Sequence, residues 1–122
     1  MAASASVTLN GTITSTPVGN RVLGPLTATS SDANWQVQLT ALASGANTIT
    51  VPSAPAPTGV IIKLPSNNTA VTTLKGISGD TGIAIGKTGW FAIVWDPTAV
   101  PASFVLNSAS AQTSKYTEIV FF

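Results

Sequence analysis

The chain has 122 residues, which is the usual size of a single domain. Charged residues make up 7% of it, against roughly 25% in an ordinary soluble domain. Because it contains no histidine and no cysteine, it lacks a thiolate nucleophile, a Ser-His pair, a disulfide framework and a structural zinc site. A net charge of +1 provides no basic cluster for nucleic acid and no attraction to an anionic membrane. We therefore predict a non-enzymatic structural or binding protein with no cofactor and no metal.

Short segments rich in Val, Ile and Thr follow one another along the chain, separated by Gly, Pro and Asn. The predicted strands are residues 7–13, 21–29, 35–41, 47–51, 60–64, 71–75, 89–95, 103–106 and 116–122. Gly24-Pro25 predicts a bulge or an edge position in the second of them. No segment shows the apolar spacing of a helix. The sequence predicts an all-β protein of about 8–9 short antiparallel strands, a β-sandwich or a small barrel. Of the two we expect the β-sandwich, jelly-roll-like in its arrangement.

This sandwich is predicted as a single domain over residues 1–122, in which residues 1–8 are a candidate extended N-terminal arm. The longest apolar run, residues 90–95, is far shorter than the roughly 20 residues that a membrane-spanning helix needs. Residues 1–6 lack a basic region followed by an apolar stretch, so we expect no secretory signal.

The segment 35–41 has the most regular pattern in the chain. Trp35, Val37, Leu39 and Ala41 alternate with polar residues. A period of two predicts a strand whose apolar face lies in the core and whose polar face meets water. The small residues at 44–46 predict a turn that joins this strand to the next one as a hairpin.

Two short motifs resemble catalytic signatures. Asp80-Thr81-Gly82 matches the core of the aspartic protease motif, but no apolar strand leads directly into the aspartate. We interpret it as a tight turn, in which the Asp caps the backbone and the glycines, Gly79 and Gly82, adopt positive φ. Gly86-Lys87-Thr88 resembles the end of a phosphate-binding loop, but a strand follows it where that motif needs a helix. Neither motif predicts a catalytic site.

Four carboxylates remain as candidates for acid–base chemistry: Asp32, Asp80, Asp96 and Glu118. A glycosidase needs two carboxylates about 5–10 Å apart. Asp32 follows two serines and Asp96 precedes a proline, so both are typical of turns. We therefore predict no catalytic pair.

Large aromatic side chains are the candidate interface or binding residues. They are Trp35, Trp90, Trp95, Tyr116, Phe121 and Phe122. Aromatic residues in a small β-protein fill the core or a subunit interface. The alternative is a platform on which a glycan stacks, as in carbohydrate-binding sandwiches.

The scarcity of charge predicts association. Monomeric sheets protect their edges with lysine, proline and inward-pointing charges, whereas this chain has at most one lysine in each predicted strand and none in residues 35–51. Its last four residues, 119–122, are apolar and promote aggregation when exposed. Either they are central in a sheet or another subunit covers them. We expect a homo-oligomer, a trimer or a dimer, or a subunit of a larger assembly.

Residues 44–97 and 102–107 resemble small virion proteins encoded in the structural gene clusters of tailed bacteriophages. The matching phrases are NTITVP at residues 47–52, GVII at 59–62 and TLKGISGDTGI at 73–83. The resemblance implies a head decoration, or cement, protein without enzymatic activity. Such proteins sit as oligomers, often jelly rolls, on the lattice of the major capsid protein, and virions assemble in the host cytoplasm. The alternative is a receptor- or carbohydrate-binding module of a tail fibre or head fibre.

Under this hypothesis the contacts are apolar, amide and hydroxyl in kind and depend weakly on salt. We expect them to use strand-edge pairing, an N-terminal arm at residues 2–8, or the C-terminal strand.

Overall fold

The described part of the chain forms ten β-strands and no helix. The computed structural model describes residues 5–15, 19–30, 36–54 and 56–122. The strands are β1 (Ala5–Ser15), β2 (Gly19–Ser30), β3 (Gln36–Thr40), β4 (Gly45–Thr50), β5 (Gly59–Lys63), β6 (Thr72–Lys75), β7 (Ile83–Ile85), β8 (Trp90–Val94), β9 (Ser103–Ser108) and β10 (Thr117–Phe121). No helix in these residues is long and apolar enough to cross a membrane. The all-β prediction is confirmed, with ten strands instead of eight or nine.

Strands β1 and β2 form a two-stranded antiparallel hairpin of their own. The register shifts between Leu9 and Gly11, so that Gly24 and Pro25 together face one residue of β1. This is the bulge that the sequence predicts at Gly24-Pro25. The peptide bond between these two residues is cis. Residues 5–8 of the expected N-terminal arm lie in β1, paired with residues 27–30.

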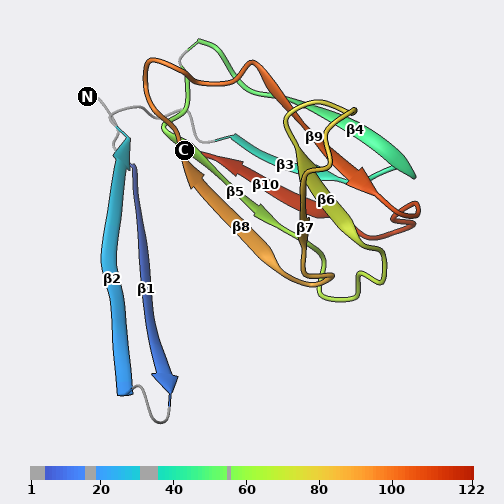
Figure 1. The fold of residues 1–122 in the computed structure, drawn as a ribbon. Helices are drawn as coiled ribbons and strands as arrows, with labels where there is room; N and C mark the ends of the chain where they lie inside the picture. The colour runs from blue at the N-terminus through green and yellow to red at the C-terminus, as the bar shows by residue number, and fades with distance from the viewer. Residues whose placement is uncertain (1–4, 16–18, 31–35, 55) are drawn as a thin grey trace.

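The other eight strands form two four-stranded sheets (Figure 1). The first sheet has the order β3-β10-β5-β8, and the second sheet has the order β4-β9-β6-β7. All the strand pairs are antiparallel. Every connection from β3 to β10 crosses from one sheet to the other, except the one between β6 and β7. We refer to the described residues from 36 to 122 as the body.

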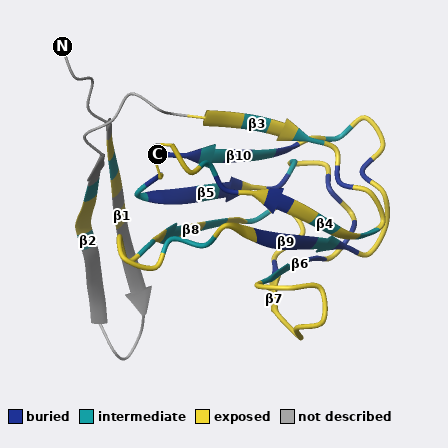
Figure 2. Ribbon diagram, turned by 90° about the horizontal axis from the view of Figure 1, so that it is seen from above, coloured by how far each residue is buried: buried dark blue, intermediate teal, exposed yellow. Residues whose placement is uncertain are grey.

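One hydrophobic core lies between the two sheets and contains side chains from both. Figure 2 shows buried residues on strands of both sheets. The first sheet contributes Val60, Ile62, Ile119 and Phe121, and the second contributes Ile49, Phe104 and Leu106. Leu42 and Val51, from the connecting segments, complete the cluster. Because neighbouring residues of a strand point to opposite faces, these positions fix which side of each sheet faces the core.

The predicted hairpin between residues 35–41 and 47–51 is wrong, because β3 and β4 lie in different sheets. The chain crosses from the first sheet to the second between them, and Leu42 in this crossing is almost completely buried. Gln112 fixes this crossing: its backbone N–H donates to the Leu42 carbonyl at 2.8 Å, and its Oε1 accepts the Leu42 N–H at 3.1 Å. Gly45 does adopt positive φ, at 90°, but there it begins a strand of the second sheet.

The C-terminal segment is central in its sheet. Strand β10 lies between β3 and β5, and Ile119, Phe121 and Phe122 are buried. Phe122 continues the pairing, since it exchanges two backbone hydrogen bonds of 3.1 Å with Gly59. Of the two alternatives for residues 119–122, the central position is therefore the observed one. Both edges of β10 are paired within the chain, so neither edge is free for strand-edge pairing with a partner.

Candidate interaction surface

The outer side of the first sheet carries an apolar surface. The register aligns Val37 with Val120, Val120 with Ile61, and Ile61 with Ala92, so one row across the four strands is entirely apolar. The next row contains Leu39, Glu118, Lys63 and Trp90, in which two neighbouring opposite charges separate two large apolar side chains. Val94 of β8 lies on the same side. We call these nine residues the apolar outer face.

Several of these side chains meet solvent over more than half of their area. The exposed fractions are 57% for Val37, 66% for Leu39, 58% for Trp90 and 62% for Val94. The sequence predicted that Val37 and Leu39 face the core, and this prediction is wrong. Gln38 and Thr40 alternate with them and are only half-buried, so the side of β3 that points inward is the polar one. The alternation is real, but its apolar side belongs to a surface.

The outer side of the second sheet has a different composition. It presents Ala46, Thr48, Thr50, Thr73, Lys75, Ala84, Ser103, Val105 and Asn107. Its large apolar residue, Val105, is buried, while Thr48 and Thr50 are exposed. Hydroxyl and amide groups therefore dominate this surface, with one charged residue among them.

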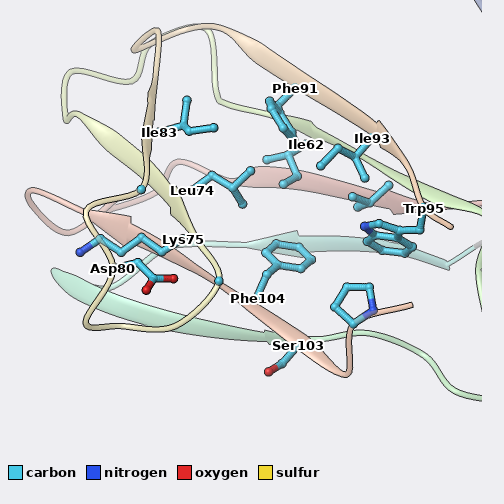
Figure 3. A pocket seen from close by; sticks show the side chains of 14 residues that line it. Ile62, Leu74, Lys75, Asp80, Ile83, Phe91, Ile93, Trp95, Ser103 and Phe104 are labelled. Atoms are coloured by element: carbon cyan, nitrogen blue, oxygen red, sulfur yellow. The ribbon is translucent and has the colours of Figure 1, made fainter. Parts of the chain in front are cut away.

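An apolar cleft of about 380 Å³ opens between the two sheets, beside β8 and the β6–β7 turn. Figure 3 shows side chains from both sheets pointing into it: Ile62, Leu74, Phe91, Ile93, Trp95 and Phe104. Lys75 and Asp80 lie at one end. With this lining, the cleft accepts apolar groups.

Asp80 forms a hydrogen bond through its carboxylate within the turn beside this cleft. Its Oδ2 accepts the backbone N–H of Ile77 at 2.9 Å, and its own N–H donates to the Ile77 carbonyl at 3.1 Å. Gly82 adopts positive φ at 74°, whereas Gly79 does not, so the expectation of positive φ is wrong for Gly79. The interpretation of Asp80-Thr81-Gly82 as a tight turn is confirmed. At the same place Lys75 donates from Nζ to the carbonyl of Ser78, at 3.3 Å.

The other carboxylates have separate surroundings. Asp96 follows β8, and its Oδ1 accepts the Thr98 hydroxyl at 2.6 Å and the Thr98 N–H at 2.8 Å. These two hydrogen bonds, the hydroxyl first, hold the pKa of Asp96 below its usual value. Glu118 lies on the apolar outer face, and Asp32 is outside the described residues. Among the described residues, no group of three metal-ligating side chains is found.

Five of the six aromatic candidates lie in the described residues, and they fall into three groups. Phe121 and Phe122 are buried in the body. Trp95 is half-buried, lines the cleft, and has its ring centroid 6.3 Å from that of Phe121. Trp90 and Tyr116 are exposed, Trp90 on the apolar outer face and Tyr116 in a shallow depression with Leu39 and Lys63. Trp35 lies outside the described residues.

Trp90 and Trp95 do not form a common stacking platform, because they lie on opposite sides of the first sheet. The surface that the structure adds to the sequence analysis is the apolar outer face. Its signal in the sequence was the alternation in residues 35–41, whose apolar side was predicted to face the core but faces outward. Comparisons with models of protein families, with curated proteins and with solved structures found no match to this chain.

Proposed function

We propose that this chain is a non-enzymatic virion structural protein, a capsid decoration or cement protein that stabilises a phage head through oligomeric contacts. The observation that carries the proposal is the apolar outer face, where Val37, Leu39 and Trp90 are exposed. Removing such a surface from water favours association with another protein surface. The resemblance on residues 44–97 supplies the virion context.

The strand order supports a jelly-roll-like β-sandwich as the fold of the body. Eight strands in two sheets of four, with nearly every connection crossing between the sheets, are the arrangement expected for a jelly roll. Viral capsid domains and lectins are both built on this fold. The fold therefore agrees with the proposal without choosing between these two functions.

The mechanism is stabilisation by selective binding. A protein that binds only the assembled lattice of the major capsid protein stabilises the lattice by its own binding free energy. Linking copies in a dimer or trimer adds avidity without any new type of contact. Neither outer face carries more than two charged residues, so these contacts depend weakly on ionic strength.

The test uses shells assembled from the major capsid protein encoded in the same genome. Purified protein is mixed with these shells and sedimented, and the disassembly temperature of the shells is measured with and without it. We expect co-sedimentation that persists from about 0.05 to about 1 M salt, and a higher disassembly temperature. Absence of co-sedimentation contradicts the decoration role. Release by salt contradicts the apolar mechanism.

The alternative is a receptor- or carbohydrate-binding module of a tail fibre or head fibre. The exposure of Trp90 on an accessible surface favours it, since an exposed indole offers a face for a sugar ring. It predicts that Trp90→Ala abolishes binding on a glycan array while the oligomer mass, measured by light scattering, is unchanged. Under the decoration proposal, the unmodified protein binds no glycan and Trp90→Ala weakens self-association.

A further inference from the structure

The β1–β2 hairpin makes no extensive contact with the other described strands. Among the described residues, its strong contacts are those between its own two strands. Figure 1 shows it standing apart from both sheets of the body. An isolated two-stranded hairpin is at best marginally stable in water, because it has no core. The hairpin therefore needs a surface to pack against.

The hairpin has one apolar side at its base. Val7 pairs with Ala28, and two residues further the register partners are Leu9 and Leu26. Leu26 remains 61% exposed. The alternate positions are polar: Thr8 pairs with Thr27, and their hydroxyls are hydrogen-bonded at 3.2 Å. Leu26, Val7 and Ala28 thus form an apolar strip, in which Leu26 is exposed and Val7 and Ala28 are half-buried.

We propose that the hairpin of one copy packs its apolar side on the apolar outer face of a second copy. The inference rests on the proposed role of this face as an assembly surface, and it names the occupant. Each chain carries one uncovered apolar strip and one uncovered apolar face, so exchange of hairpins covers both with a single kind of contact. Residues 6–10 of β1 span roughly 17 Å, the same as the five-residue strands of the face.

Charge supports the same pairing. The described residues of the hairpin include one charged residue, Arg21, and the base of the hairpin has none. On the face, Glu118 and Lys63 are register neighbours of opposite sign, so the surface has no net charge. Packing therefore brings no like charges together, and the two opposite charges of the face stay next to each other. Reciprocal exchange closes a dimer, and cyclic exchange closes a ring such as a trimer.

The absence of cysteine in the natural chain makes a crosslinking test direct. Two single variants, Leu26→Cys and Leu39→Cys, are produced with tags of different length, mixed after unfolding, refolded together and treated with a short bismaleimide. Both positions are exposed, so the substitutions do not disturb the core. We expect a mixed crosslinked dimer at least about tenfold above the controls, because docking raises the effective concentration of the two thiols.

Two matched pairs serve as controls. Thr27→Cys with Leu39→Cys moves the thiol to the polar side of the hairpin, and Leu26→Cys with Thr48→Cys moves it to the second sheet. Mixed dimer equal to the controls overturns the proposal. A double variant, Leu26→Cys with Leu39→Cys, that crosslinks only within one chain also overturns it, since the hairpin then covers the face of its own copy.

This experiment separates the two proposals. Crosslinking without co-sedimentation on capsid shells removes the decoration role and keeps the hairpin exchange. Co-sedimentation without crosslinking removes the exchange and keeps the decoration role.

Discussion

The two outer faces of the body both meet solvent, but one is composed mainly of polar side chains and the other mainly of apolar ones. Both belong to four-stranded antiparallel sheets whose inner sides share one core. On the second sheet, Thr48, Thr50 and Thr73 hydrate the surface with hydroxyl groups instead of charges. On the first sheet, seven of the nine outward positions are Val, Leu, Ile, Ala or Trp, and the other two are Glu118 and Lys63. The outer face of the second sheet is thus suited to contact with water despite the low charge of the chain. The outer face of the first sheet has the apolar composition of a surface that contacts another protein.

This comparison also changes the reason for expecting an oligomer. The sequence argument rested on the scarcity of charge and on the apolar C-terminal residues, yet Phe121 and Phe122 are buried within the single chain. The structural argument rests instead on β3 and β8, the two edge strands of the first sheet, which carry Leu39 and Trp90. Association remains a proposal, with a different surface responsible.

The largest expected effect separates the two sides of a single strand. Phe121 is fully buried, so Phe121→Ala should lower the free energy of unfolding by about 3–5 kcal/mol at any protein concentration. Val120 is its neighbour on the apolar outer face, so Val120→Ala should cost less than about 1 kcal/mol in dilute protein and more at high concentration. Urea titrations at two protein concentrations measure both. Equal, concentration-independent losses would mean that Val120 is part of the core.

The next effect compares the two faces directly. Leu39→Lys places a charge on the apolar outer face, and its burial in an interface should raise the dissociation constant of the oligomer at least about 100-fold. Thr48→Lys places the same charge on β4, an edge strand of the second sheet, and should change that constant less than about threefold. Light scattering over a dilution series gives both constants. A larger effect for Thr48→Lys would reverse the assignment of the faces.

A smaller effect on stability distinguishes Trp90, the first residue of β8, from Trp95, which follows its last residue. Trp95 is half-buried against Phe121, so Trp95→Ala should lower the free energy of unfolding by about 2–3 kcal/mol. Trp90 lies on the outer side, and Trp90→Ala should cost less than about 0.5 kcal/mol in dilute protein. Thermal unfolding followed by circular dichroism is the measurement. A larger loss at Trp90 would contradict its placement.

Strand positions were largely predictable, because period-two alternation is a local property. The nine predicted segments each overlap a strand, from β1 to β10 with β7 left out. Strand β7 has three residues, Ile83–Ile85, between the Asp80 turn and a glycine, too few for a periodic signal. The bulge at Gly24-Pro25 was also predictable, since proline cannot donate a ladder hydrogen bond.

Sheet membership and sidedness were not predictable from the same pattern. Alternation shows that Val37 and Leu39 share a side, but it does not say whether that side meets the core or another surface. Which one holds depends on β10, some 80 residues later, whose Ile119 and Phe121 fill the core from the neighbouring strand. The crossing at Leu42 likewise depends on Gln112, a contact between residues far apart in sequence. The side of β3 that faces the core and the crossing at Leu42 are therefore both set by tertiary contacts.

The smallest predicted effect concerns a charge outside both faces. The Thr98 hydroxyl is the first cause of the lowered pKa of Asp96, so Thr98→Ala should move that pKa back toward the usual 3.8 while the backbone N–H of residue 98 keeps part of the shift. A lowered pKa in the folded state means that ionised Asp96 contributes stability above its unfolded pKa. This contribution is lost as pH falls through the folded value.

Carbon-detected NMR titration of the Asp96 carboxyl measures the shift, and Thr81→Ala, on an exposed turn without a hydrogen bond to Asp96, is the control. An unchanged Asp96 pKa in Thr98→Ala would mean that the hydroxyl does not hold the carboxylate. If the expected pKa shift is observed, four of the charged residues in this chain have two kinds of role. Asp80 and Asp96 fix turns, and Glu118 with Lys63 interrupts the apolar outer face. Association then has to be driven by apolar area, because the charges that remain are too few to direct it.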